Sequence, residues 1–356
     1  MLPSDHPIHK LADSDYLRAC RSETHDRVPV WFQRQAGRSL PEYHAIRGPG
    51  SILQTLRNPE ISAEITLQPV RRYGVDAAIL YSDIVVPAEC IGFGVDVVPG
   101  VGPVIEAPFR SASDLERLRP LDPDNDTAHV LKTIEILVRE LTIPLIGFAG
   151  APFTLASYLI EGRPSRDYAN TKALMLNDPG LWHQLMERLS DLAIVSIRSQ
   201  VLAGACAVQL FDSWAGALAP ADYREFVLPH SSRVFAELED FGVPRAHFGV
   251  GTGELLSMFA EAGADVVGVD WRIPLDEARR RTGGEVALQG NLDPAVCLAE
   301  WPNVSEHVRR VLAANDGHPG HIFNLGHGVL PATDPAILEQ VVALVHEEGS
   351  VGAGDD

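Results

Sequence analysis

Short apolar runs alternate with amphipathic stretches along almost the whole chain, and this alternation constrains the fold more than any other feature. The apolar runs are 28–32, 77–81, 144–148, 207–211, 245–250, 265–269, 286–289 and 321–325. Such runs, bounded by turn residues, are typical of parallel strands buried on both faces. Helical patterns lie between them, at 59–73, 126–141, 181–203, 221–241, 253–262, 294–314 and 334–347. The alternation predicts an α/β fold.

Eight strand candidates in βα alternation favour a single (β/α)8 barrel of the TIM type over residues 1–348. A doubly wound open sheet is the alternative, but no strand candidate is followed by GxGxxG or by a Walker A loop. The stretch 91–109, "IGFGVDVVPGVGPVIEAPF", has strand–turn–strand chemistry and predicts a β-hairpin inserted after the second strand. The tail 349–356 is polar and rich in glycine, so we expect it to be disordered.

Four helical patterns begin with a polar residue followed by proline. Asn58, Asp178, Asp293 and Asp334 hold these positions. Each is predicted to be an N-cap, because proline is tolerated at the first helical position.

Charge and composition restrict the classes of partner. The chain has 356 residues, is 46% hydrophobic and carries a formal net charge of −19. Binding of nucleic acid through a general basic face is therefore not expected. The N-terminus has no signal-peptide pattern, and no apolar run reaches the length of a membrane span. The four cysteines form no CxxC or HxC pattern, so no disulfide framework or thiolate metal site is expected. We expect a soluble, cytoplasmic protein.

Polar residues follow several strand candidates, where a parallel barrel gathers its chemistry. These residues are Arg34, Arg38, Ser82, Asp83, Tyr158, Asp212, Ser213 and His327. Two arginines around a tight glycine turn, in an otherwise acidic chain, favour recognition of a carboxylate or a phosphate.

Each of these residues also has a structural interpretation. Asp83 resembles a helix N-cap, although "IVVP" follows it and Pro87 disfavours a helix there. Asp212 fits a cap or a structural carboxylate, and Tyr158 fits a half-buried aromatic residue. His327 stands between two glycines, which allow its backbone to approach another part of the chain closely.

Five segments together resemble the signature segments of the uroporphyrinogen decarboxylase family. They are "RQAGRSLPEY", "YSDIVVP", "GFAGAPFTLASYLIEG", "QLFDSWAG" and "NLGHGVLP", and they run from the first strand to the last. The resemblance implies a single (β/α)8 barrel, usually a homodimer, that needs no metal or organic cofactor. It implies an enzyme of haem biosynthesis that removes CO₂ from the four acetate side chains of uroporphyrinogen III to give coproporphyrinogen III.

The resemblance also implies roles for individual residues. It makes Asp83 the central catalytic residue, and Arg34 a candidate for handling the proton. The implied substrate-binding residues are Arg34, Gln35, Ala36, Gly37, Arg38, Asp83, Tyr158, Ser213 and His327. A related cobalamin-linked methyltransferase would need a thiolate–histidine zinc site, and the HxC pattern for it is absent. A noncatalytic tetrapyrrole carrier would keep the arginines and have no need of Asp83.

Overall fold

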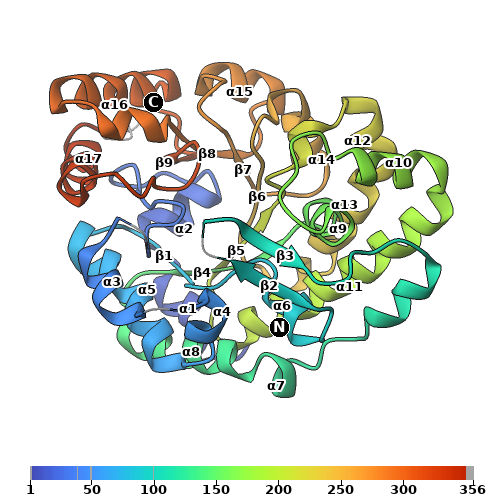
Figure 1. The fold of residues 1–356 in the computed structure, drawn as a ribbon. Coiled ribbons are helices and arrows are strands. Elements are labelled where there is room, and N and C mark those ends of the chain that lie inside the picture. Colours follow the sequence, from blue (N-terminus) through green and yellow to red (C-terminus); the bar gives the residue numbers. More distant parts are fainter. Residues whose placement is uncertain (1, 38, 49, 99, 350–356) are drawn as a thin grey trace.

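The computed structural model describes residues 2–37, 39–48, 50–98 and 100–349. Its centre is a curled sheet of seven parallel strands, and Figure 1 shows the helices arranged around it. The strands neighbour one another in chain order. They are β1 (Ala78–Ile79), β4 (Leu145–Gly150), β5 (Ala207–Phe211), β6 (Arg245–Phe248), β7 (Val266–Gly268), β8 (Ala287–Leu292) and β9 (His321–Leu325). The predicted α/β class is confirmed, with strands at seven of the eight predicted positions.

Burial explains why these strands read as continuous apolar runs. All residues of β4, β8 and β9 are buried, including those whose side chains alternate to the outer face. One face of the sheet is covered by the helices, and the other packs in the interior, so neither side selects polar residues.

The predicted strand 28–32 is present only as a single bridge, which corrects the expectation of a full strand. Val30 pairs in parallel with Phe323 of β9, and its carbonyl accepts a hydrogen bond from Asp76 N–H at 2.8 Å, just before β1. Pro29 has no N–H to contribute to a ladder, and the chain enters a turn at Gln33. This segment therefore lies between the first and last strands of the sheet without forming a regular strand itself.

Helices surround the sheet. The α-helices are α1 (Pro7–Leu11), α2 (Asp15–Cys20), α3 (Pro41–Arg47), α4 (Ile52–Leu56), α5 (Pro59–Tyr73), α6 (Val86–Cys90), α7 (Pro123–Asp126), α8 (Ala128–Glu140), α9 (Pro152–Glu161), α10 (Ala169–Asn177), α11 (Pro179–Ala203), α12 (Pro220–Phe226), α13 (Leu228–Ala236), α14 (Leu256–Glu261), α15 (Leu275–Thr282), α16 (Trp301–Asn315) and α17 (Pro335–Glu348). The 3₁₀ helices are η1 (Ala112–Arg117), η2 (Ala215–Ala217), η3 (Glu239–Phe241), η4 (Gly253–Leu255) and η5 (Pro294–Leu298).

Proline divides two of the predicted helices. The pattern 221–241 becomes α12, α13 and η3, with Pro229 in the first turn of α13. The pattern 294–314 becomes η5 and α16, with Pro302 in the first turn of α16. Proline lacks an N–H and is favoured at a helix start, so these patterns restart where a single helix was expected.

The four predicted N-caps are confirmed. In each case the side chain accepts a hydrogen bond from a backbone N–H in the first turn. The bonds join Asn58 to Ile61, Asp178 to Leu181, Asp293 to Ala295 and Asp334 to Ala336, at 2.9–3.0 Å.

An antiparallel pair of strands lies apart from the parallel sheet. β2 (Val95–Val98) pairs with β3 (Gly102–Ile105), within the stretch where the sequence predicts a hairpin. β2 contacts α4 and α6, and β3 contacts α9; Figure 1 shows the pair next to α6. It forms part of the wall of the cavity described below.

Gly349 corrects the predicted start of the disordered tail. This residue is buried, and its carbonyl accepts a hydrogen bond from Val28 N–H at 2.7 Å. The rest of the predicted tail, 350–356, lies outside the described residues. None of the helices in the described part of the chain has the length and apolar character that spanning a membrane requires.

Candidate active site

A cavity of about 830 Å³ opens at the carboxyl ends of the parallel strands. Residues that follow β1, β5, β6 and β9 line part of it, and another part is lined by Val97 and Val98 of β2 and by Val101, which precedes β3. Its volume lies within the range of about 300–1,000 Å³ that is usual for small-molecule sites.

Seven of the nine predicted site residues line this one cavity. They are Arg34, Ala36, Gly37, Asp83, Tyr158, Ser213 and His327. The side chain of Gln35 is buried away from it, and Arg38 lies outside the described residues. Segments that are far apart in the sequence therefore converge as the strand order requires.

Arg34 is held in an unusual backbone conformation. Gln35 N–H donates to Phe32 O at 3.0 Å, and Arg34 has a φ of +60°, in the left-handed region that favours glycine. The Gln35 side chain fixes this turn, because its Oε1 accepts from Phe32 N–H at 3.0 Å and its Nε2 donates to Ala77 O at 3.1 Å. Gln35 thus supports the turn that presents Arg34 to the cavity.

The two glycines around His327 are explained by close contacts. A methyl group at Gly328 would lie 2.5 Å from Cδ of Arg34, and one at Gly326 would lie 3.0 Å from Cβ of Trp271. A larger residue at Gly328 would require the Arg34 side chain to move, and one at Gly326 would also fall against the backbone N of Trp271, which cannot give way as a side chain can. The expectation of close backbone approach at His327 is confirmed, and one of the groups approached is Arg34.

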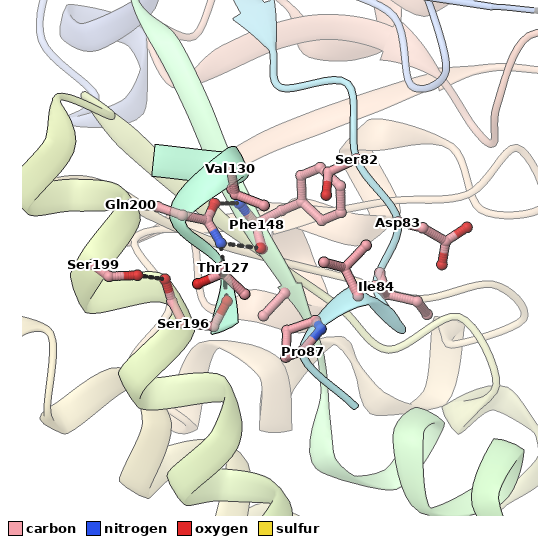
Figure 2. A pocket seen from close by; sticks show the side chains of 12 residues that line it. Ser82, Asp83, Ile84, Pro87, Thr127, Val130, Phe148, Ser196, Ser199 and Gln200 are labelled. Atoms are coloured by element: carbon pink, nitrogen blue, oxygen red, sulfur yellow. Dashed lines mark hydrogen bonds between the residues drawn. The ribbon is translucent and has the colours of Figure 1, made fainter. Parts of the chain in front are cut away.

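Asp83 enters the cavity because its segment leaves the sheet. Leu80 still pairs with β4, through a hydrogen bond from its N–H to Ile146 O at 3.1 Å. Farther along β4, the backbone N–H and C=O of Phe148 are both bound by the Gln200 side chain at 2.9 Å. Figure 2 shows this bidentate contact, with the Asp83 carboxylate directed away from Gln200. Gln200 thus binds the backbone groups of β4 that a neighbouring strand would pair with, and the β1–β4 ladder ends before Asp83.

A short helix follows Asp83, contrary to the interpretation that Pro87 disfavours one. α6 begins at Val86 and accommodates Pro87 in its first turn, where a missing N–H has no cost. Asp83 Oδ1 accepts a hydrogen bond from Val85 N–H at 3.1 Å. Asp83 therefore has a local structural contact in addition to its position on the cavity wall. A second pocket of about 10 Å³, the size of one water molecule, lies behind it (Figure 2).

The charged and aromatic groups of the cavity influence one another. Burial, and then the negative charge of Asp83, raise the pKa of the Tyr158 hydroxyl, while the positive charge of Arg34 partly opposes this. Burial and the charge of Arg34 lower the pKa of His327 to about 4. His327 is consequently neutral near pH 7, and its Nδ1 has no hydrogen-bond partner among the described residues.

Asp212 is a structural carboxylate, as one interpretation of the sequence suggested. Its side chain is fully buried, it does not line the cavity, and its Oδ1 accepts a hydrogen bond from Thr154 Oγ1 at 2.8 Å. The next two residues, Ser213 and Trp214, do line the cavity. Asp212 thus lies directly behind a part of the cavity wall.

Several cavity residues were not found from the sequence, among them Arg47, Trp214, Tyr81 and Tyr43. Arg47 on α3 adds a cation, and its Nη2 donates to Gly50 O at 2.8 Å. Trp214 packs against Tyr158 with ring centroids 3.8 Å apart, and Tyr81 bonds Tyr43 through their hydroxyls at 3.1 Å. Arg47 follows no strand candidate, so the strand-end rule could not select it. Trp214 does follow a strand, and its position next to Ser213 in the sequence would have predicted that it lines the cavity.

No candidate metal centre was found in the part of the chain that the structure describes. Within it, no three His, Cys, Asp or Glu side chains come together in a group that could hold a metal ion.

Comparison with known proteins gives consistent matches over almost the whole chain. The family model for uroporphyrinogen decarboxylase (URO-D) matches residues 11–348. The uroporphyrinogen decarboxylase of Salinispora tropica is 60% identical over 337 residues, which cover 94% of this chain and 91% of that protein. The uroporphyrinogen decarboxylase of Streptomyces coelicolor is 58% identical over 97% of this chain and 98% of its own.

Solved structures share the fold at low sequence identity. A methyltransferase from Methanosarcina mazei superposes with a TM-score of 0.78 at 19% identity, over 95% of this chain and 98% of its own. A B12-independent methionine synthase from Shewanella superposes with a TM-score of 0.56 at 13% identity, over 91% of this chain and 97% of its own. At such identities the likeness concerns the fold alone.

Proposed function

The chain belongs to the uroporphyrinogen decarboxylase family, and from this premise we propose how its cavity carries out the reaction. The protein is a carboxy-lyase of porphyrin biosynthesis that removes CO₂ from the acetate side chains of uroporphyrinogen III. The observation that carries this function is the identity of 55–60% to uroporphyrinogen decarboxylases over 94–97% of the chain.

The curled sheet belongs to a closed (β/α)8 barrel in this proposal. The segment of Val30 supplies the eighth position, because it bonds to β9 on one side and to the start of β1 on the other. The β2–β3 pair is then an insertion after the second strand of the barrel. Closure would fix the strand ends around one mouth, as the convergence of Arg34, Asp83 and His327 requires.

Arginines bind the carboxylates of the substrate. Uroporphyrinogen carries eight carboxylates, and charge-assisted hydrogen bonds from guanidinium groups suit them. Arg34 and Arg47 line the cavity, and Arg38 is assigned to the same role by its place in the motif. The backbone at Ala36 and Gly37 adds N–H donors, and Ser213 adds a hydroxyl. The net charge of −19 confines this affinity to the local cations.

Loss of CO₂ needs an acceptor for the electron pair left on the ring-bound CH₂. Protonation of the adjacent pyrrole α-carbon makes the ring cationic, so the C–COO⁻ bond can break toward the ring. The CH₂ carbon then takes up a proton and the pyrrole α-carbon releases one. Each acetate thus consumes one proton and yields a methyl group and CO₂. The substrate itself is the electron sink, so no organic cofactor or metal is required.

Asp83 stabilises the cationic ring. Its carboxylate accepts hydrogen bonds from the pyrrole N–H groups and faces the positive charge as it develops. Opposite charges about 4 Å apart attract by roughly 4 kcal/mol at an effective dielectric constant of about 20. A carboxylate fixed in place before the reaction acts without reorganisation, which makes it a strong catalytic group. The hydrogen bond from Val85 N–H supplies this fixation.

Arg34 is the second catalytic residue of the proposal, orienting the reacting acetate and taking part in the proton transfer to the substrate. Arg34 lines the cavity together with His327 and Tyr158, and its charge acts to lower the pKa of both, which supports a position near them. Neutral His327 offers a hydrogen bond without adding a positive charge that would repel the cationic ring. Tyr158 contributes a hydroxyl that stays protonated, because its pKa is raised.

The quaternary state and location follow from the family resemblance. We infer a homodimer in the cytoplasm. All four cysteines are free, which is consistent with a reducing compartment. Light scattering of the purified protein tests the dimer directly.

The decisive test of function is anaerobic incubation of the purified protein with uroporphyrinogen III. Chromatography should show products with seven, six, five and finally four carboxylates. Absence of any product with fewer than eight carboxylates, from a folded protein, would contradict the function.

A further inference from the structure

The buried hydroxyl of Thr154 connects two parts of the cavity wall. Thr154 lies in α9, is fully buried, and donates from Oγ1 to Asp212 Oδ1 at 2.8 Å. The same oxygen accepts a hydrogen bond from Trp214 N–H at 3.2 Å. One side chain therefore joins a helix to the loop after β5 through both hydrogen-bonding capacities of its hydroxyl.

The two parts that Thr154 joins each present a cavity residue. Tyr158 lies one turn after Thr154 on α9, and Ser213 and Trp214 follow Asp212. The rings of Tyr158 and Trp214 meet with centroids 3.8 Å apart, and Tyr168 approaches Trp214 at 5.0 Å. The aromatic contact and the Thr154 hydrogen bonds hold the same two segments together, one at the cavity and one behind it.

Burial of the Asp212 carboxylate costs free energy that packing alone does not offset. Its exposure is 0%, and its Oδ2 lies 3.7 Å from Nε2 of His247 without a hydrogen-bond partner among the described residues. A buried carboxylate costs free energy unless hydrogen bonds offset that cost, so its retention behind the wall calls for a role. The bond to Thr154 directs the hydroxyl proton toward Asp212, which leaves the oxygen lone pairs to accept from Trp214 N–H.

We propose that Thr154 and Asp212 are positioning residues that lock Tyr158, Ser213 and Trp214 into one rigid wall for the tetrapyrrole. The inference rests on the proposed function and deepens it, because it assigns part of the affinity for the substrate to hydrogen bonds outside the cavity. These are the bonds from Thr154 to Asp212 and from Trp214 N–H to Thr154, which we call the relay. The substrate must stay bound, or rebind, for four successive decarboxylations. A rigid wall is already ordered before the substrate binds, so binding does not have to order it. Loss of this rigidity should therefore weaken substrate binding more than it slows the chemical step at Asp83.

Thr154→Val tests the relay, because it keeps the shape of the side chain and removes both hydrogen bonds. We expect KM for uroporphyrinogen III to rise about tenfold, the factor that one or two hydrogen bonds of ordinary strength give. The kcat for the first decarboxylation should stay within about threefold of wild type, since Asp83 and Arg34 are untouched. Products with seven to five carboxylates should be released in larger amounts, because the weakened grip raises the rate of dissociation.

Two further variants separate positioning from general stability. Thr154→Ser keeps the hydroxyl and should restore KM and the product pattern. Thr133→Val is the matched control, since Thr133 is also buried in a helix, and among the described residues its hydroxyl bonds only His129 O within α8, at 2.8 Å. It should leave KM and the product pattern unchanged. If Thr154→Val does not fold, Thr154→Ala provides the same comparison.

The outcomes distinguish the relay from the function on which it rests. A wild-type protein that does not decarboxylate contradicts the function. An active wild type with unchanged KM and product pattern in Thr154→Val contradicts the relay. The relay is also contradicted if Thr133→Val shifts KM equally, or if Thr154→Ser fails to restore it.

Discussion

The α-carbon of Gly328 lies directly beneath the side chain of Arg34, so that a methyl group there would fall 2.5 Å from Cδ and 2.8 Å from Cγ of the arginine. The segment that follows β9 thereby limits where the side chain of Arg34 can lie. Arg34 is fixed from two sides, by this contact and by the turn that Gln35 holds.

Gly328→Ala should displace Arg34 without disturbing the fold. The added methyl group cannot coexist with the arginine stem, and the arginine is flexible enough to move away. We expect kcat/KM to fall by roughly tenfold or more, the effect of losing a charged hydrogen bond of about 1.5–3 kcal/mol. Steady-state kinetics and thermal unfolding check both expectations. Gly180→Ala is the control, because a methyl group there lies no closer than 3.6 Å to a neighbour.

Arg34→Ala should reduce both binding and turnover, whereas Arg34→Lys should recover part of the binding only. Lysine retains a positive charge but lacks the planar fork that engages a carboxylate through two bonds. Removal of a charged hydrogen bond predicts a loss of about 1.5–3 kcal/mol in transition-state stabilisation for the alanine variant. Measurement of kcat and KM for both variants decides this. Wild-type values for Arg34→Ala would show that the arginine is not in the site.

Much of this site could be predicted because strand order alone brings strand ends together. Asp83 and His327 were identified as site candidates without knowledge of any contact between them. The conformation of Arg34 could not be predicted, because its positive φ depends on Gln35 bonding Ala77 far along the chain. Arg47 was missed for a similar reason, since it reaches the cavity from a helix outside the alternating pattern.

Local rules failed where a proline was judged without its position. The rule that proline disfavours a helix predicts none at Pro87, but this residue lies in the first turn of α6, where proline favours a helix. The strand 28–32 was overestimated because its apolar pattern says nothing of Pro29, whose missing N–H limits pairing. Both errors concern backbone hydrogen bonds, which hydrophobic patterns do not report.

Acid should destabilise the protein well before the carboxylates titrate. Burial lowers the pKa of His321 and of His230 from 6.5 to about 4, and the charge of His183 adds to the effect at His230. Between these values the unfolded chain binds protons that the folded chain does not, so stability is full above pH 6.5 and is lost as pH falls toward 4. Urea unfolding should show a free energy at pH 5 at least about 1 kcal/mol below that at pH 7.5. An equal or higher value at pH 5 would contradict these shifts.

Removal of metal ions should leave the activity unchanged. The electron sink in the proposed reaction is the pyrrole ring, so no step depends on a Lewis acid. Protein dialysed against a chelator, and assayed in metal-free buffer, should retain wild-type kcat and KM. Lost turnover that zinc restores would contradict the proposed chemistry.

The charge of Asp83 is the centre of the proposed mechanism, and Asp83→Asn removes the charge while keeping the shape. Asparagine can still accept the hydrogen bond from Val85 N–H, so the fold and the start of α6 should be unchanged. Asp334→Asn is a matched control, because Asp334 makes the same kind of bond, to Ala336 N–H at 2.9 Å, and does not line the cavity.

The most direct test is the rate of CO₂ release from saturating uroporphyrinogen III by Asp83→Asn, measured anaerobically beside wild type and Asp334→Asn. Loss of one preorganised electrostatic group predicts a decrease in kcat of roughly 10²–10³-fold for Asp83→Asn, with a melting temperature near that of wild type. Asp334→Asn should decarboxylate at the wild-type rate. A folded Asp83→Asn protein that also decarboxylates at nearly the wild-type rate would contradict the role of the carboxylate in stabilising the cationic ring.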